Sequence, residues 1–157
     1  MASHPALANA VLLVTAAVLF YVAVTDLKQY KIRNELILLL LALFVLHTLL
    51  SGRWVEAAWG LGLAAIVFAF LLFFYSRHWM GGGDVKLLSV AFLWTGVDCA
   101  LPFAILLLLF ASLHSVAARF GLMPAQNDPD ARRRIAFAPS VAVAMIAVFL
   151  LGCLRPA

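Results

Sequence analysis

The sequence has 157 residues, of which 66% are hydrophobic and 11% are charged, and its mean hydropathy is +1.09. This composition excludes an ordinary soluble domain, because a soluble protein of this size must cover its surface with polar groups. The formal net charge of +4 does not indicate a nucleic-acid partner, since the basic residues fall mainly in loops between apolar segments. The chain is therefore expected to lie in a lipid bilayer.

Apolar segments of about the length that crosses a bilayer recur along almost the whole chain. Glycine, serine or proline separates several of them, at positions 51–52, 81–83, 96 and 102. The sequence thus predicts an all-α, polytopic membrane protein with a single membrane-embedded domain, residues 1–157. About six transmembrane helices are expected, at Leu7–Val24, Leu36–Leu50, Val55–Tyr75, Val85–Thr95, Ala100–Ala118 and Phe137–Leu151.

Lysine and arginine are distributed unevenly between the two sides of this layout. Nine lie in the first, third and fifth loops, and two lie on the other side. Because cytoplasmic loops carry an excess of basic residues, the odd-numbered loops are predicted to be cytoplasmic and both termini to be on the outer, periplasmic face. The nine are Lys28, Lys31, Arg33, Arg77, Lys86, Arg119, Arg132, Arg133 and Arg134, and the two are Arg53 and Arg155.

Two acidic residues are expected on the same face of the membrane. Asp26 follows the first predicted helix, and the chain then crosses twice before it reaches Asp84 at the start of the fourth. Carboxylates at a membrane edge are costly and often mark function. Two neighbouring carboxyl groups can hydrolyse an amide, because one takes a proton from water while its protonated partner polarises the carbonyl. Such a pair needs no metal and no other cofactor.

The surroundings of each aspartate allow a further prediction and an alternative. Helix dipoles predict that Asp84, at a helix N-terminus, favours the anion, and that Asp26, at a helix C-terminus, favours the protonated form. The three glycines at 81–83 allow a positive φ and the approach of an extended peptide, which a helix there would hinder. Alternatively, Asp84 only caps a helix and Asp26 is a solvated loop acid. Their common face favours a site.

Both segments resemble the aspartate motifs of bacterial type IV prepilin peptidases, which are aspartic membrane proteases. Gly81–Lys86 matches the family pattern Gly-x-Gly-Asp-x-Lys, and Asp26–Asn34 is similar to Asp-x-basic followed by Ile-Pro-Asn, with Arg33 in place of the proline. A proline-containing segment that opens the last helix is matched by Ile135–Pro139, with Ala138 where a glycine is expected. The resemblance implies Asp26 and Asp84 as catalytic residues. It implies supporting or substrate-binding roles for Gly81, Gly83, Lys86, Lys28 and Asn34.

The resemblance also implies a substrate and a location. The expected activity is cleavage of the leader of a small pilin precursor after glycine, at the cytoplasmic face of the bacterial inner membrane. Larger family members carry an additional N-terminal cytoplasmic region that is associated with methyl transfer, and this chain has none. It is therefore expected to be the short form that serves tight-adherence (Flp) pili, without methyltransferase activity. Nothing in the sequence specifies an oligomeric state.

Other readings of these features stay open. Lys28 and Lys86 each follow an aspartate by two positions, and either tune the pair or only follow the positive-inside rule and meet lipid phosphates. A proton-coupled transporter also uses membrane acids, but it usually places them near the midplane of repeated helices. A non-catalytic scaffold would use a face of small residues such as Gly60 and Ala64, and would tolerate Asp84→Asn. Another Gly-x-Gly-Asp intramembrane protease would differ only in its substrate.

Overall fold

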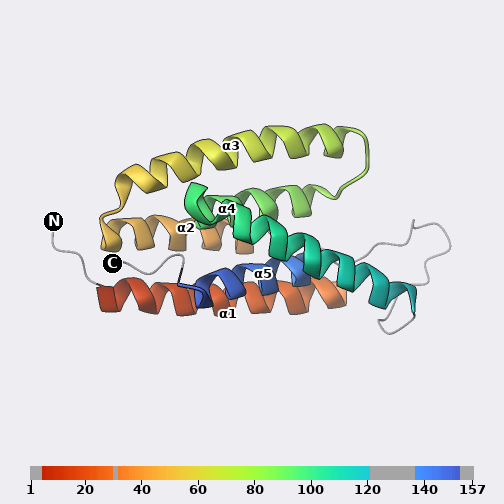
Figure 1. Cartoon of the computed structure of the whole chain (residues 1–157), viewed down its shortest axis with the longest axis horizontal. Helices are drawn as coiled ribbons and strands as arrows, with labels where there is room; N and C mark the ends of the chain where they lie inside the picture. The colour runs from red at the N-terminus through yellow and green to blue at the C-terminus, as the bar shows by residue number, and fades with distance from the viewer. Residues whose placement is uncertain (1–4, 30–31, 121–136, 153–157) are drawn as a thin grey trace.

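A computed structural model of the chain describes residues 5–29, 32–120 and 137–152. All regular secondary structure in these residues is α-helical (Figure 1), which confirms the all-α prediction. The helices are α1 (Pro5–Gln29), α2 (Asn34–Ser51), α3 (Trp54–Ser76), α4 (Gly82–Arg119) and α5 (Ala138–Leu150).

Within the described ranges, four helices, α1 to α4, are long and apolar enough to cross a membrane, and α5 is a shorter apolar helix of 13 residues. Large apolar side chains are exposed along these helices, among them Leu13, Val55, Ile66 and Leu101. Helices that are apolar on all sides suit lipid rather than water as their surroundings. The chain is thus a multi-pass membrane protein.

The most visible departure from the predicted layout is in α4. The residues labelled α4 cover both of the predicted segments Val85–Thr95 and Ala100–Ala118, as two helices joined at a kink. Its backbone leaves the helical conformation at Gly96, where φ is 62° and ψ is −172°, a combination open almost only to glycine. Figure 1 shows the two halves of α4 running in opposite directions from this region. The predicted turn at Gly96 is therefore confirmed. Six separate spans are not, because within the described residues four helices have the length of a span when α4 is counted as one.

Close backbone packing joins α3 to the first half of α4. Gly60 of α3 is buried, and a Cβ atom on it would lie 3.0 Å from the carbonyl oxygen of Leu93. Ala64, one turn later, is also buried. The face of small residues on α3 is therefore used inside this molecule, where it lets two helices approach closely.

Several helix ends lie together at one end of the bundle because of the directions in which the helices run. The end of α1, the starts of α2, α4 and α5, and the end of α3 lie at the same end of the bundle (Figure 1). We call this the aspartate end, because Asp26 lies near the end of α1 and Asp84 at the start of α4. The shorter helix α5 packs against both α1 and α4. Its buried side chains join the core of the bundle, which includes Leu19, Val22, Trp94, Phe103, Val141 and Met145.

Candidate active site

Asp26 lies inside α1 rather than beyond its end, because the helix continues to Gln29. Its side chain is buried, with 4% of the residue exposed. One carboxylate oxygen, Oδ2, accepts a hydrogen bond of 3.1 Å from the backbone N–H of Ala138, and the amide of Phe137 also interacts with the carboxylate. The first amides of a helix lack partners within that helix, so they form a natural site for an acidic group. Asp26 thus joins α1 to the first turn of α5.

Ala138 shows why the start of α5 needs a small residue. It is fully buried and directly donates to Asp26. Pro139 follows at the first helical positions, where a missing N–H costs nothing. The alanine that stands in place of the expected glycine therefore leaves the contact with Asp26 intact.

Asp84 lies in the first turn of α4 and is half-buried. The expectation that the glycines before it use a positive φ is wrong, because none of the three at 81–83 has one and α4 already begins at Gly82. The residue with a positive φ in this loop is His78, at 56°. The backbone amide of Gly81 interacts with the Asp84 carboxylate, as in a helix whose third residue reaches back to its cap.

The glycines are explained by their neighbours instead. A Cβ atom on Gly83 would lie 3.1 Å from Cβ of Ile32, and one on Gly82 would lie 3.3 Å from Cε2 of Tyr75. A Cβ atom on Gly81 would lie 2.9 Å from Oδ2 of Asp84 itself. Each glycine thus makes room for a side chain, and Gly83 makes room for one from the segment that follows Asp26.

Several contacts join the two aspartate motifs. The carboxyl groups of Asp26 and Asp84 are close enough to interact electrostatically. Nζ of Lys86 donates a hydrogen bond of 2.9 Å to Oδ1 of Asn34, the first residue of α2. Together with the contact between Ile32 and Gly83, this bond ties the start of α4 to the connection between α1 and α2. Of the predicted supporting residues, Gly81, Gly83, Lys86 and Asn34 are thus brought together around the pair.

Lys28 and Arg33 take other positions. Lys28 is exposed in the last turn of α1, where a positive charge suits the helix dipole, and no ion pair or hydrogen bond to it is present within the described residues. Arg33 replaces the proline of the resembling motif, yet its backbone has φ of −74° and ψ of 133°, which a proline also adopts. The bend after α1 therefore does not depend on proline at this position.

Two features near Asp26 were not predicted from the sequence. His114, from the second half of α4, is close enough to interact electrostatically with the Asp26 carboxylate. The N-terminal amides of α5 also face this carboxylate. Asp26 therefore lies near the C-terminal end of α1 and at the N-terminal end of α5, and the two helix dipoles act on it in opposite senses. The simple contrast between the aspartates that was expected from helix dipoles therefore does not hold in that form. Neither feature has a local signal in the sequence, because His114 and Ala138 are both far from Asp26 along the chain.

The described residues contain no group of three or more His, Cys, Asp or Glu side chains that could hold a metal ion. They do contain a cavity of about 460 Å³, but it lies between the end of α2, the start of α3 and the middle of α4. This is the end of the bundle opposite the aspartates, and neither aspartate lines it. The cavity and the acidic pair are therefore separate features.

These observations define the class of protein as a multi-pass helical membrane protein with two interacting aspartates at one end of the bundle. A model of the type IV leader peptidase family matches residues 13–119, and the chain belongs to this family. The match includes both aspartate motifs and ends before α5. Family membership makes the chain a protease with a leader-peptidase type of function, and it implies a prepilin as the class of substrate. Searches of curated proteins and of solved structures gave no significant match.

Proposed function

We propose that this chain is an aspartic prepilin peptidase in which Asp26 and Asp84 form the catalytic pair. The observation that carries the proposal is the junction of the two motifs, in which the aspartates interact and Ile32, Asn34, Gly83 and Lys86 hold their segments together. Family membership supports the class of reaction.

The proposed chemistry is the addition of water to the scissile carbonyl. One carboxylate takes a proton from the water while the partner, in its protonated form, donates a hydrogen bond to the carbonyl oxygen. The amide nitrogen then receives a proton as the C–N bond breaks. Two carboxyl groups that interact suit this division of roles, since they do not both ionise easily and can share one proton.

The proposed topology has six crossings, with α4 contributing two of them on either side of Gly96. The reversal of chain direction within α4 supports this count (Figure 1). It keeps the aspartate end on one side of a bacterial inner membrane, and the excess of Lys and Arg at that end favours the cytoplasmic face. Cleavage on that face, after a glycine of a small Flp-type prepilin, is the activity to test first. Methyl transfer is not part of the proposal.

The deciding experiment is co-expression of the full chain with a Flp-type prepilin, with precursor size followed on a gel. We expect the wild type to convert the precursor. Asp26→Asn and Asp84→Asn should each lower the conversion rate by at least about a hundred-fold, because each removes a group that moves a proton. Membrane insertion of every variant is checked by its recovery in washed membranes.

Glu35→Gln is the matched control. Glu35 is an acid at the same end of the bundle, but it is exposed and paired with Arg33, and such surface pairs contribute little to stability. This variant should cleave like the wild type. Full cleavage by either inserted aspartate variant would reject the catalytic pair. Loss of cleavage in Glu35→Gln as well would show that the assay reports general damage rather than catalysis.

A further inference from the structure

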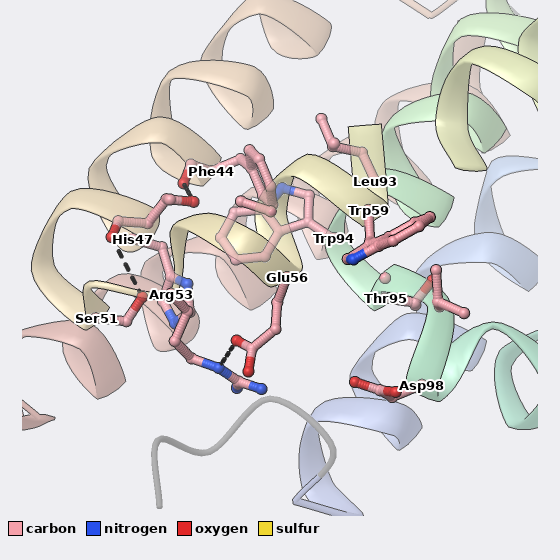
Figure 2. A pocket seen from close by; sticks show the side chains of 14 residues that line it. Phe44, His47, Ser51, Arg53, Glu56, Trp59, Leu93, Trp94, Thr95 and Asp98 are labelled. Atoms are coloured by element: carbon pink, nitrogen blue, oxygen red, sulfur yellow. Dashed lines mark hydrogen bonds and ion pairs between the residues drawn. The ribbon is translucent and has the colours of Figure 1, made fainter. Parts of the chain in front are cut away.

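The cavity at the end opposite the aspartates has polar and aromatic walls. Its lining includes His47 from α2, Arg53 and Trp59 at the start of α3, and Trp94 and Asp98 from α4 (Figure 2). A volume of about 460 Å³ is within the range of sites for small ligands, which are typically lined by apolar side chains with a few polar groups. The combination of side chains indicates what such a ligand would carry.

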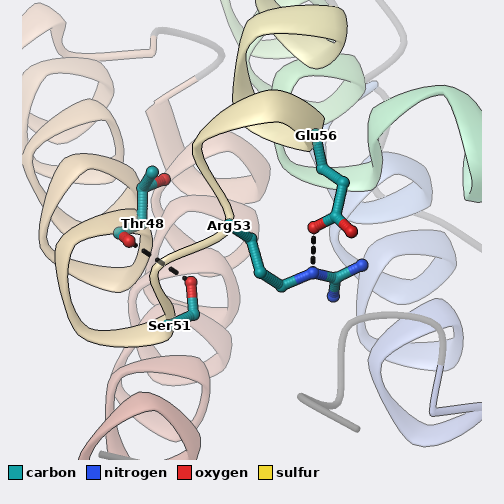
Figure 3. Close-up of polar contacts among 4 residues, drawn as sticks. All are labelled: Thr48, Ser51, Arg53 and Glu56. Atoms are coloured by element: carbon teal, nitrogen blue, oxygen red, sulfur yellow. Dashed lines mark hydrogen bonds and ion pairs between the residues drawn. The ribbon is translucent and has the colours of Figure 1, made fainter. Parts of the chain in front are cut away.

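One buried atom in this wall lacks a partner. His47 is 6% exposed, and its Nε2 atom is the buried side-chain nitrogen or oxygen that has no hydrogen-bond partner within the described residues. Leaving such a group unsatisfied destabilises the fold, and a ligand that bonds to it removes this penalty. Other polar groups nearby are already used: Nε1 of Trp94 donates to the carbonyl of Leu40 at 3.1 Å, and Oγ of Ser51 donates to the carbonyl of Thr48 at 3.4 Å (Figure 3). His47 therefore remains available to a ligand.

Among the described charged side chains that line the cavity, one carboxylate has no ion pair. Arg53 forms an ion pair with Glu56 (Figure 3), whereas Asp98 has no ion pair in the part of the chain that the structure describes. Figure 2 shows Asp98 across the opening from that pair. A carboxylate without an ion pair and the exposed Trp59 ring in the same lining suit an ammonium group, which both carboxylates and aromatic faces attract. The guanidinium of Arg53 can also meet a phosphate.

The position of the cavity indicates that this ligand comes from the membrane. Trp59 is 69% exposed and Val55 is 72% exposed, so the start of α3 presents apolar surface beside the opening. Tryptophan is typical of the level at which lipid headgroups lie. We propose that this cavity binds the headgroup of an amine-bearing, ethanolamine-type phospholipid, with the amine toward Asp98, the phosphate toward Arg53 and the acyl chains on α3. A headgroup with both a donor and an acceptor also satisfies His47 in either tautomer.

The test uses the full chain, purified in detergent with an equal mixture of palmitoyl-oleoyl phosphatidylethanolamine and phosphatidylglycerol with the same acyl chains. Native mass spectrometry then counts the lipids retained. We expect the wild type to retain the ethanolamine lipid about ten-fold over the glycerol lipid, which lacks an amine. Asp98→Asn should remove most of this preference, whereas Glu35→Gln, an exposed acid at the other end, should keep it. Equal retention by the wild type, or an unchanged preference in Asp98→Asn, would overturn the proposal.

A second variant separates binding from folding. In His47→Leu, the unsatisfied nitrogen is replaced by an apolar group, so the thermal midpoint in lipid-free detergent should be unchanged or higher, while retention of the ethanolamine lipid falls several-fold. Retention equal to that of the wild type would argue against a role for His47 and for the cavity. Free O-phosphoethanolamine at millimolar concentration should not displace the lipid. If it does, the site takes a soluble headgroup, and the assignment to a membrane lipid is wrong.

Discussion

At the residue level, Gly83 illustrates how a motif glycine serves the site. A Cβ atom on Gly83 would lie 3.1 Å from Cβ of Ile32, closer than nearly all such contacts, so Gly83→Ala must push the two motif segments apart. We expect this variant to cleave prepilin about ten-fold more slowly, because small displacements of reacting groups are costly. Precursor conversion measured over time in co-expressing cells gives the rate.

A second substitution, at Ile32, should compensate for Gly83→Ala, and a substitution at Gly62 serves as the control. Ile32→Gly removes the Cβ atom that lies 3.1 Å from the added methyl group, so the double variant Gly83→Ala with Ile32→Gly should recover most of the lost rate. Gly62→Ala is the matched control, since a Cβ atom on Gly62 would have no neighbour within 4 Å. A double variant as slow as Gly83→Ala alone would mean that contact with Ile32 is not the reason for the glycine.

The same residues show what sequence can predict at this scale. The side of the membrane shared by Asp26 and Asp84 was predicted from the number of crossings between them. The positive φ expected of the glycines is absent, and their close neighbours Ile32 and Tyr75 could not be predicted, because tertiary packing sets the positions of these side chains. The hydrogen bond from Ala138 to Asp26 spans 112 positions, and no local pattern contains such a pairing.

At the level of elements, α4 depends on a single residue for its change of direction. Gly96 has φ of 62° and ψ of −172°, and a Cβ atom there would have no neighbour within 4 Å. The cost of Gly96→Ala is therefore purely a backbone cost, and we expect it to lower the free energy of unfolding by about 1–3 kcal/mol. Thermal unfolding of the purified chain in detergent, followed by circular dichroism, measures this loss.

Gly62→Ala again provides the comparison, because it places the same methyl group in a regular part of α3. There alanine favours the helix by about 0.5–1 kcal/mol over glycine, so this variant should unfold at the same or a higher temperature. If Gly96→Ala unfolds like Gly62→Ala, α4 does not need the strained conformation, and the proposed division into two crossings loses its support. The sequence marked this break through glycine and the nearby Pro102, but hydropathy alone does not show that α4 reverses.

At the level of the whole molecule, orientation decides which compartment the aspartate end faces. The three lysines of the chain, Lys28, Lys31 and Lys86, all belong to segments beside the two aspartates. Lys28 and Lys86 are exposed, and Lys31 lies outside the described residues. Because the opposite end has no lysine, an amine-reactive label reports the orientation of the natural chain without any substitution.

We therefore expect a membrane-impermeant, sulfonated succinimidyl ester to modify Lys28 and Lys86 in inside-out vesicles and to leave them unmodified in right-side-out vesicles. Peptide mass spectrometry identifies the modified amines. The N-terminal amine, which the charge distribution predicts to be on the outer face, should show the opposite pattern and so serves as the internal control. Lysine modification from the outside would reverse the orientation. The aspartates would then face the periplasm, and a prepilin leader on the cytoplasmic side would be out of their reach.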